Sequence, residues 1–198
     1  MAVIALPSAF SGSIRRIQWS LLRPAQINRS GYTGRRTVVA NPWHSVWMAS
    51  VDLVPLTDAK AADVRAFLAL LKGQINTCRL PAVYEVQSAS AVTVNGDHAA
   101  GVAILSTTGW PNSSIVLPAG SFITVNDQLI MLTAQAISNG SGVASLALGT
   151  PLRDAAANGA SVNVSEPTAI MSLVEDTVGW SVEPGRFTSI SLQFEEAY

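Results

Sequence analysis

Apolar and polar residues alternate along four short stretches of the chain, residues 14–22, 46–54, 178–183 and 188–196. This period of two is typical of a β-strand with one buried face. Each stretch is therefore predicted to be a strand. The apolar side chains expected to face the core are Ile17, Trp19, Leu21, Trp47, Ala49, Val51, Leu53, Trp180, Val182, Ile190, Leu192 and Phe194.

Glycines predict how the first strands are connected. Gly31 and Gly34 indicate a turn between the strand at 14–22 and a further strand at 35–40. Together with the strand at 46–54, these segments predict a three-stranded antiparallel meander.

Residues 57–73 carry the pattern of an amphipathic helix. Val64, Phe67, Leu68 and Leu71 recur at helical spacing and form one apolar stripe. The start is marked by Thr57 as N-cap and by Asp58 in the first turn, and Gly73 supplies the stop. We expect the stripe to pack on a sheet, and a further strand to follow within residues 75–86.

Residues 86–165 have a different texture, with four charged residues in the segment. Short apolar runs alternate with turn signals there, which indicates a small all-β barrel or sandwich. The sequence SFITVNDQLIML predicts a tight hairpin with Asn126 and Asp127 in its turn.

These elements predict a mainly β (α+β) fold. Residues 1–85 plus 166–198 would form an antiparallel β-sandwich or split-barrel domain with one packed helix. A small all-β domain, residues 86–165, would interrupt it, as insertions in exposed loops are well tolerated.

Charge is sparse and unevenly distributed. Charged residues make up 13% of the chain, against about 25% in an ordinary soluble domain, which suggests that other subunits cover part of the surface. Residues 1–36 hold six arginines and no acid, whereas residues 166–198 hold six acids and one arginine. These ends can pair within one fold or between neighbours in a head-to-tail ring.

The basic turn at residues 28–36 is the main candidate site. Arg29, Arg35 and Arg36 lie beside Tyr32, and arginine and aromatic side chains are enriched at interface hot spots. We therefore predict a protein contact, with Glu195 and Glu196 as its acidic counterpart. A solvated loop and a nucleic-acid site are the alternatives, but the sequence pI of about 6.1 does not favour specific nucleic-acid recognition.

Catalytic and cofactor chemistry find little support. His44 and His98 lack partners at metal-site spacing, and the glycine-rich segment 139–145 lacks the lysine of a phosphate-binding loop. Cys78 is the single cysteine and is expected to be an inert, half-buried thiol. We expect no enzyme, no cofactor and no metal.

Two further classes are a carbohydrate-binding module and a membrane protein. Trp110 in TTGWPNSS is the one candidate for a carbohydrate-binding module. The charge-free segments 98–126 and 128–152 are interrupted by Gly, Pro and Asn, so no membrane span is expected. Because the first arginines follow the apolar start, we expect a soluble protein without a secretion signal.

The order of parts resembles a known family. A basic glycine-containing hairpin (INRSGYTGRRTVV), a Trp-rich strand (NPWHSVWMASVDLVPLT), a helix ending in FLALLKGQINTCRLP and an inserted β segment with GSGVASLALGTPLR are similar to the distal tail proteins, minor tail proteins of long-tailed bacteriophages. The resemblance covers most of the chain and rests on the arrangement of the parts.

The resemblance implies a structural role in the virion. Members of the family form a homo-oligomeric ring, commonly a hexamer, that joins the tail-tube protein to the tail-tip hub protein, and they assemble in the host cytoplasm. Some carry an extra sugar-binding domain, but no lectin motif is found here. A tail terminator or completion protein at the other end of the tail is the nearest alternative.

Overall fold

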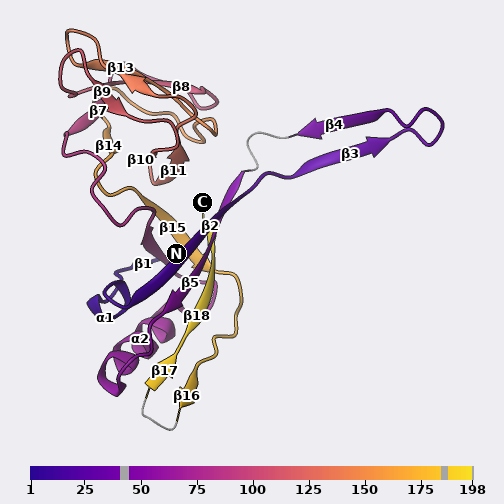
Figure 1. The fold of residues 1–198 in the computed structure, drawn as a ribbon, viewed down its shortest axis with the longest axis vertical. Helices are drawn as coiled ribbons and strands as arrows, with labels where there is room; N and C mark the ends of the chain where they lie inside the picture. The colour runs from indigo at the N-terminus through magenta and orange to yellow at the C-terminus, as the bar shows by residue number, and fades with distance from the viewer. Residues whose placement is uncertain (41–44, 184–186, 198) are drawn as a thin grey trace. The chain divides into compact units, whose positions relative to one another are not determined.

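The computed structural model describes residues 1–40, 45–183 and 187–197, and Figure 1 shows its ribbon. With 45% of residues in strands and 10% helical, the predicted mainly β fold class is confirmed. The chain forms two compact units. The sheet unit comprises residues 1–20, 47–84 and 168–198, and the barrel unit comprises 21–46 and 85–167. The predicted boundaries were different, because residues 21–46 were expected in the sheet unit.

A six-stranded sheet forms the centre of the sheet unit (Figure 1). Strands β6, β15, β18 and β5 pair antiparallel in that order, whereas β1 joins β6 in parallel, a pairing that the sequence did not predict. In spatial order the strands are β1 (Val3–Ile4), β6 (Thr77–Pro81), β15 (Thr168–Leu173), β18 (Ser191–Glu196), β5 (Val46–Leu53) and β2 (Ile14–Leu22).

Alternation along the strands places one face of this sheet in the core. On β5, Trp47, Ala49, Val51 and Leu53 are buried, and the residues between them are half-buried. On β18, Phe194 is fully buried and pairs with Ala49 of β5 and Leu173 of β15. These inward faces were predicted and are confirmed.

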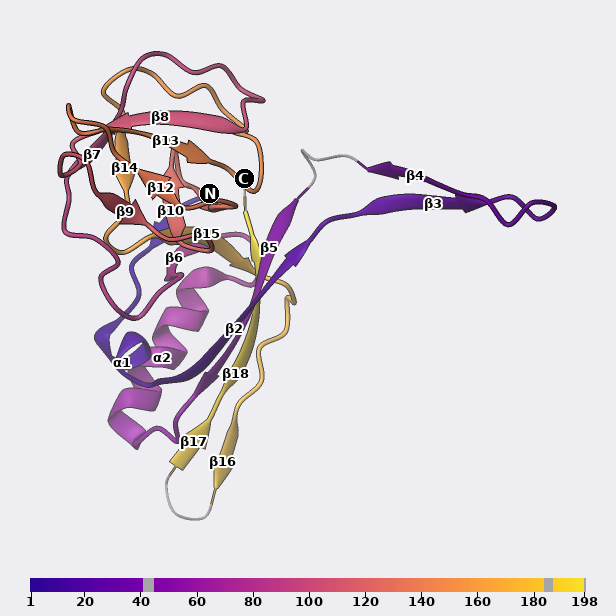
Figure 2. The ribbon, with the colours of Figure 1, turned by 45° about the horizontal axis from the view of Figure 1, so that its top comes forward.

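Two helices accompany the sheet in the described part of the unit (Figure 2). Helix α2 (Asp58–Leu71) buries the predicted stripe together with Ala61. The short helix α1 (Ser8–Ser11) adds Phe10, whose ring centroid lies 5.4 Å from that of Phe67. Thr57 holds the N-cap position, but its side chain makes no capping hydrogen bond. The helix is ended by Lys72 and Gly73, which both have a left-handed backbone conformation.

The barrel unit contains a second six-stranded sheet (Figure 2). A bridge between Leu132 and Leu148 joins its two outer strands, so the sheet curls back on itself and leaves little open edge. In order the strands are β11 (Gln128–Met131), β10 (Phe122–Val125), β14 (Ser161–Asn163), β7 (Val92–Val94), β8 (Ile104–Thr108) and β13 (Val143–Ala147), with β9 (Ile115–Leu117) and β12 (Ala136–Ile137) forming a small separate pair.

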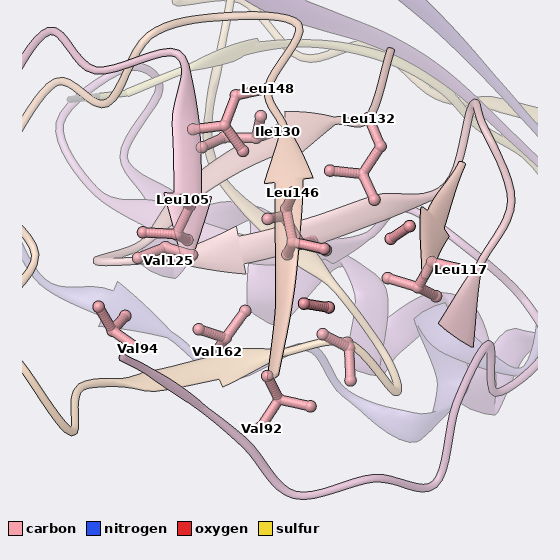
Figure 3. Close-up of a cluster of buried hydrophobic side chains, with 14 of the residues drawn as sticks. Val92, Val94, Leu105, Leu117, Val125, Ile130, Leu132, Leu146, Leu148 and Val162 are labelled. Atoms are coloured by element: carbon pink, nitrogen blue, oxygen red, sulfur yellow. The ribbon is translucent and has the colours of Figure 1, made fainter. Parts of the chain in front are cut away.

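The curled sheet encloses an aliphatic core (Figure 3). Leu105, Ile130 and Leu146 are fully buried there. The predicted hairpin is also confirmed, because β10 and β11 pair up to Val125 and Gln128 with Asn126 and Asp127 both at positive φ between them. Two successive left-handed residues match a two-residue type I′ turn.

The predicted three-stranded meander is wrong. The strand at 14–22 lies beside β5 in the main sheet, and a separate strand, β3 (Ala25–Arg29), pairs with β4 (Arg36–Ala40). Pro24 stands between β2 and β3, and proline has no N–H to offer a ladder. A third two-stranded pair, β16 (Ser181–Glu183) and β17 (Phe187–Ser189), precedes β18.

Candidate protein-protein interface

The β3–β4 hairpin is built from the basic stretch that the sequence analysis singled out (Figure 1). Its five residue pairs run from Ala25 and Ala40 to Arg29 and Arg36. The turn is closed by the Ser30 N–H donating to the Arg35 carbonyl at 3.0 Å and the Gly34 N–H donating to the Ser30 carbonyl at 2.9 Å. Gly34 has φ +66°, a conformation that glycine adopts without strain.

Every residue of this hairpin is exposed. An isolated two-stranded hairpin is marginally stable in water. A partner that covers one of the two exposed faces would therefore stabilise it. Ile27 and Val38 form a cross-strand pair and are 50% and 47% exposed, which leaves apolar area in solvent on both strands.

The two faces of the hairpin differ in chemistry. Side chains two apart on a strand, and those directly opposite on its partner, share a face. One face, called the apolar face below, carries small and aliphatic side chains near the base of the hairpin and two arginines towards the turn. The other face is mainly polar. The apolar face comprises Ala25, Ile27, Val38 and Ala40, followed by Arg29 and Arg36.

The hairpin's arginines lack acidic partners within the part of the chain that the structure describes. Arg29 and Arg36 face each other across the strands, and like charges directly opposite destabilise a hairpin. Arg35 and Tyr32 lie in the turn, where Tyr32 is 99% exposed. The four predicted hairpin residues are thus gathered at one end of one ribbon, available to an external partner.

Glu195 and Glu196 occupy different environments. Adjacent strand residues point to opposite faces, and Glu196 is 5% exposed, with its carboxylate accepting a hydrogen bond from the Trp47 N–H at 3.0 Å. Glu195 is half-buried. Because Glu196 joins β18 to β5 inside the sheet unit, it is a structural residue and the prediction that it lies at an interface is wrong.

An acidic and apolar surface, which the sequence did not predict, runs from the end of β15 into β16. We call residues 174–182 the acidic loop. Glu175 and Asp176 are exposed, Trp180 is 47% exposed and Val182 is 62% exposed. Trp180 and Val182 were predicted to face the core, and that prediction is wrong. The alternation was present, but Trp180 lies before β16, and among the described residues β16 pairs with β17 alone, so no second strand helps to cover Val182.

The acidic loop also borders a cavity of about 250 Å³. Its apolar lining includes Leu173, Val178 and Leu192, and Glu175 lies at the same cavity. The loop is held beside β18, because the Val174 N–H donates to the Gln193 carbonyl at 3.0 Å. Thr177, Ser191 and Gln193 add polar groups to the lining. A cavity with a few aliphatic residues, several polar groups and one carboxylate suits a side chain with an apolar stem and a cation beside it.

The residues considered for chemistry have structural partners. The Trp110 indole N–H donates to the Thr107 hydroxyl at 2.8 Å, and the ring is 5% exposed. His98 Nε2 accepts the Ser106 N–H at 3.2 Å, and His44 lies outside the described residues. Within those residues, no three His, Cys, Asp or Glu side chains gather as a metal site, and no helix is long and apolar enough to cross a membrane.

Cys78 is expected to resist thiol reagents in the folded protein. It lies on β6 with no exposed surface, and burial raises the pKa of its thiol from 9.0 to about 12. At pH 8 the difference lowers the thiolate fraction about a thousandfold relative to the unfolded chain. A maleimide should label the protein in guanidinium and leave it unlabelled in buffer, as mass spectrometry can determine.

The raised pKa of Cys78 makes the stability of the folded protein depend on pH. A thiol that is harder to ionise when folded stabilises the native state below about pH 9, and this contribution is lost as the pH rises towards 12. Rapid labelling of the native protein at pH 8 would contradict the buried position of Cys78.

Comparison with protein-family models and with curated proteins found no match for this chain.

Proposed function

We propose that the chain is a structural protein of a bacteriophage tail, which forms an oligomeric ring between the tail tube and the tail-tip hub. Its place is the virion, after assembly in the host cytoplasm. The sequence resemblance to distal tail proteins suggests this role. The observation that carries it is the β3–β4 hairpin, whose residues are all exposed although it has an apolar face and closely spaced arginines.

The hairpin supports a protein contact better than catalysis or specific nucleic-acid recognition. Its charge is confined to the end near the turn, while the remainder of one face is aliphatic. A nucleic-acid site would use cations along the backbone and aromatic platforms, whereas an aliphatic patch with arginines at its end is typical of a protein interface. We assign the protein no catalytic activity, cofactor or metal.

The other candidate classes have weaker support. A carbohydrate-binding module was proposed on Trp110, and a buried indole offers no stacking platform to a sugar. A tail terminator would share the ring and the hairpin contact, so it stays the alternative within the same class. Mixing the protein with tail-tube protein and with tail-tip hub protein distinguishes a distal tail protein from a tail terminator, because a distal tail protein binds both partners.

Charge reversal in the turn tests the proposal. We expect Arg35→Glu combined with Arg36→Glu to weaken ring formation, and with it co-assembly with tail-tube protein, about tenfold or more, because an interface charge brought against its own sign costs several kcal/mol. Sedimentation velocity and negative-stain imaging would measure the complexes. Lys60→Glu with Lys72→Glu makes the same charge change at exposed positions in and just after α2 and should leave assembly intact. Equal assembly by all three proteins would refute the proposed contact.

A further inference from the structure

The hairpin and the acidic loop are complementary in charge and in apolar character. The hairpin offers Ile27 and Val38 next to Arg29 and Arg36. The acidic loop offers Trp180 and Val182 in the same segment as Glu175 and Asp176. The loop thus supplies the carboxylates that the hairpin lacks, and the hairpin supplies the cations that the loop lacks.

We propose that the apolar face of the hairpin of one copy docks on the acidic loop, residues 174–182, of a second copy. Ile27 and Val38 cover exposed apolar surface of the loop, and the guanidinium groups of Arg29 and Arg36 pair with Glu175 and Asp176. The proposal rests on the proposed function in one respect, namely that the chain forms a ring with itself.

Charge distribution favours the second copy's loop over its hairpin as the occupant. Residues 1–51 contain no Asp or Glu, so stacking two hairpins would bury aliphatic side chains without supplying any carboxylate for the arginines. The acidic loop places two exposed carboxylates near apolar side chains. An arginine there can also lie over the exposed Trp180 ring, an arrangement that favours Arg.

The cavity beside the loop provides an anchor point. Its volume of about 250 Å³ accommodates one side chain, and its lining combines Val178 and Leu192 with Glu175 and the polar Thr177, Ser191 and Gln193. Interfaces concentrate their binding energy where an anchoring side chain fills a pocket. Ile27 offers such a side chain, and Arg29 follows it two residues later on the same face.

The geometry of the contact determines the kind of assembly. Two different surfaces of the same chain meet, which is a heterologous contact, and repeating it closes a ring when the rotation between copies allows. It also assigns the basic N-terminal and acidic C-terminal parts of the chain to the two sides of each interface.

Site-specific cross-linking tests the contact. Since Cys78 is fully buried, single cysteines can be added at the surface without replacing it. The full-length variants Ile27→Cys and Val182→Cys are mixed and treated with a short bismaleimide, and products are separated by mass. We expect a dimer joined between the two variants, formed several-fold more than with Gln26→Cys, which lies on the opposite face of β3.

Three outcomes of the cross-linking itself would overturn the docking. These are equal yields from Gln26→Cys and Ile27→Cys, preferential joining of Ile27→Cys to itself, and a link within single chains of an Ile27→Cys and Val182→Cys double variant at high dilution. The first indicates no specific contact, the second indicates hairpin stacking, and the third indicates an intramolecular contact. If no cross-link forms and the protein is instead retained on an oligonucleotide column, the hairpin is assigned to nucleic acid and the docking is wrong.

Charge reversal separates this inference from the proposed function. Glu175→Lys with Asp176→Lys should weaken self-association about tenfold or more, and adding Arg29→Glu with Arg36→Glu should restore it. The control, Glu85→Lys with Glu166→Lys, changes exposed acids elsewhere and should have little effect. If rings form regardless of these charges, the docking is wrong and the ring proposal stands. If the wild-type chain forms no ring alone or with tail-tube protein, both are wrong.

Discussion

Phe194→Ala is expected to lower the free energy of unfolding of the sheet unit by about 3–5 kcal/mol, as large-to-small changes at buried aromatic positions do. Phe194 is fully buried on β18, with Ala49 opposite on one side and Leu173 on the other. Removing its ring leaves a cavity between strands that are anchored on both sides, so little relaxation can fill it.

Cys78 makes this loss measurable for the sheet unit alone. Because it lies on β6 in the same sheet and has no exposed surface, maleimide labelling along a guanidinium series reports the opening of that sheet. The labelling midpoint should fall strongly for Phe194→Ala. Gln193→Ala is the matched control, since Gln193 is exposed on the same strand and loses only a hydrogen bond to Ser50. Equal shifts for the two variants would contradict the assigned strand faces.

Gly109→Ala should destabilise the barrel unit by about 2–4 kcal/mol, as the sum of about 1 kcal/mol for positive-φ strain and about 1–3 kcal/mol for a steric clash. Gly109 has φ +99°, and a Cβ there would lie 2.3 Å from the Ala91 carbonyl oxygen. Since the clashing atom belongs to the backbone next to β7, it cannot rotate away. Hydrogen exchange in peptides that cover β7 and β8 should accelerate, while the Cys78 labelling midpoint stays near that of the wild type.

Gly96→Ala separates the effect of positive-φ strain from that of the steric clash. Gly96 has φ +84°, and no atom lies within 4 Å of its added Cβ, so only the left-handed conformation is penalised, by about 1 kcal/mol. A Gly109→Ala effect no larger than that of Gly96→Ala would show that β7 and the end of β8 are not in close contact.

Local patterns predicted those parts of the fold that depend on neighbouring residues. The stripe of α2 followed from helical spacing, and the β10–β11 hairpin followed from Asn126 and Asp127, which tolerate the left-handed conformation of a tight turn. The buried faces of β5 and β18 followed from their period of two. In each case the information lies within about ten residues of sequence.

The remaining features depend on pairings between distant residues. The bridge between Leu132 and Leu148 that curls the barrel sheet, and the parallel pairing of β1 with β6, leave no local signal. Trp180 and Val182 were misplaced for the same reason, since alternation does not reveal that Trp180 lies outside β16 or that, among the described residues, β16 pairs with β17 alone. Glu196 was misplaced because its backbone partner, the Trp47 N–H, is far away in sequence.

The candidate site was predicted in composition but not in geometry. Arg29, Tyr32, Arg35 and Arg36 were recognised from the sequence. The apolar face was missed, although counting pairs outward from the turn places Ile27 opposite Val38. That count requires the register, which the two glycines of the turn left open.

The solution mass of the full-length protein tests the ring most directly. Light scattering combined with negative-stain imaging should give closed rings with a mass that is a multiple of 20.8 kDa, either alone or after mixing with tail-tube protein. Six copies correspond to about 125 kDa in a closed cyclic assembly. A monomer of 20.8 kDa that forms no ring with any tail partner would contradict the account.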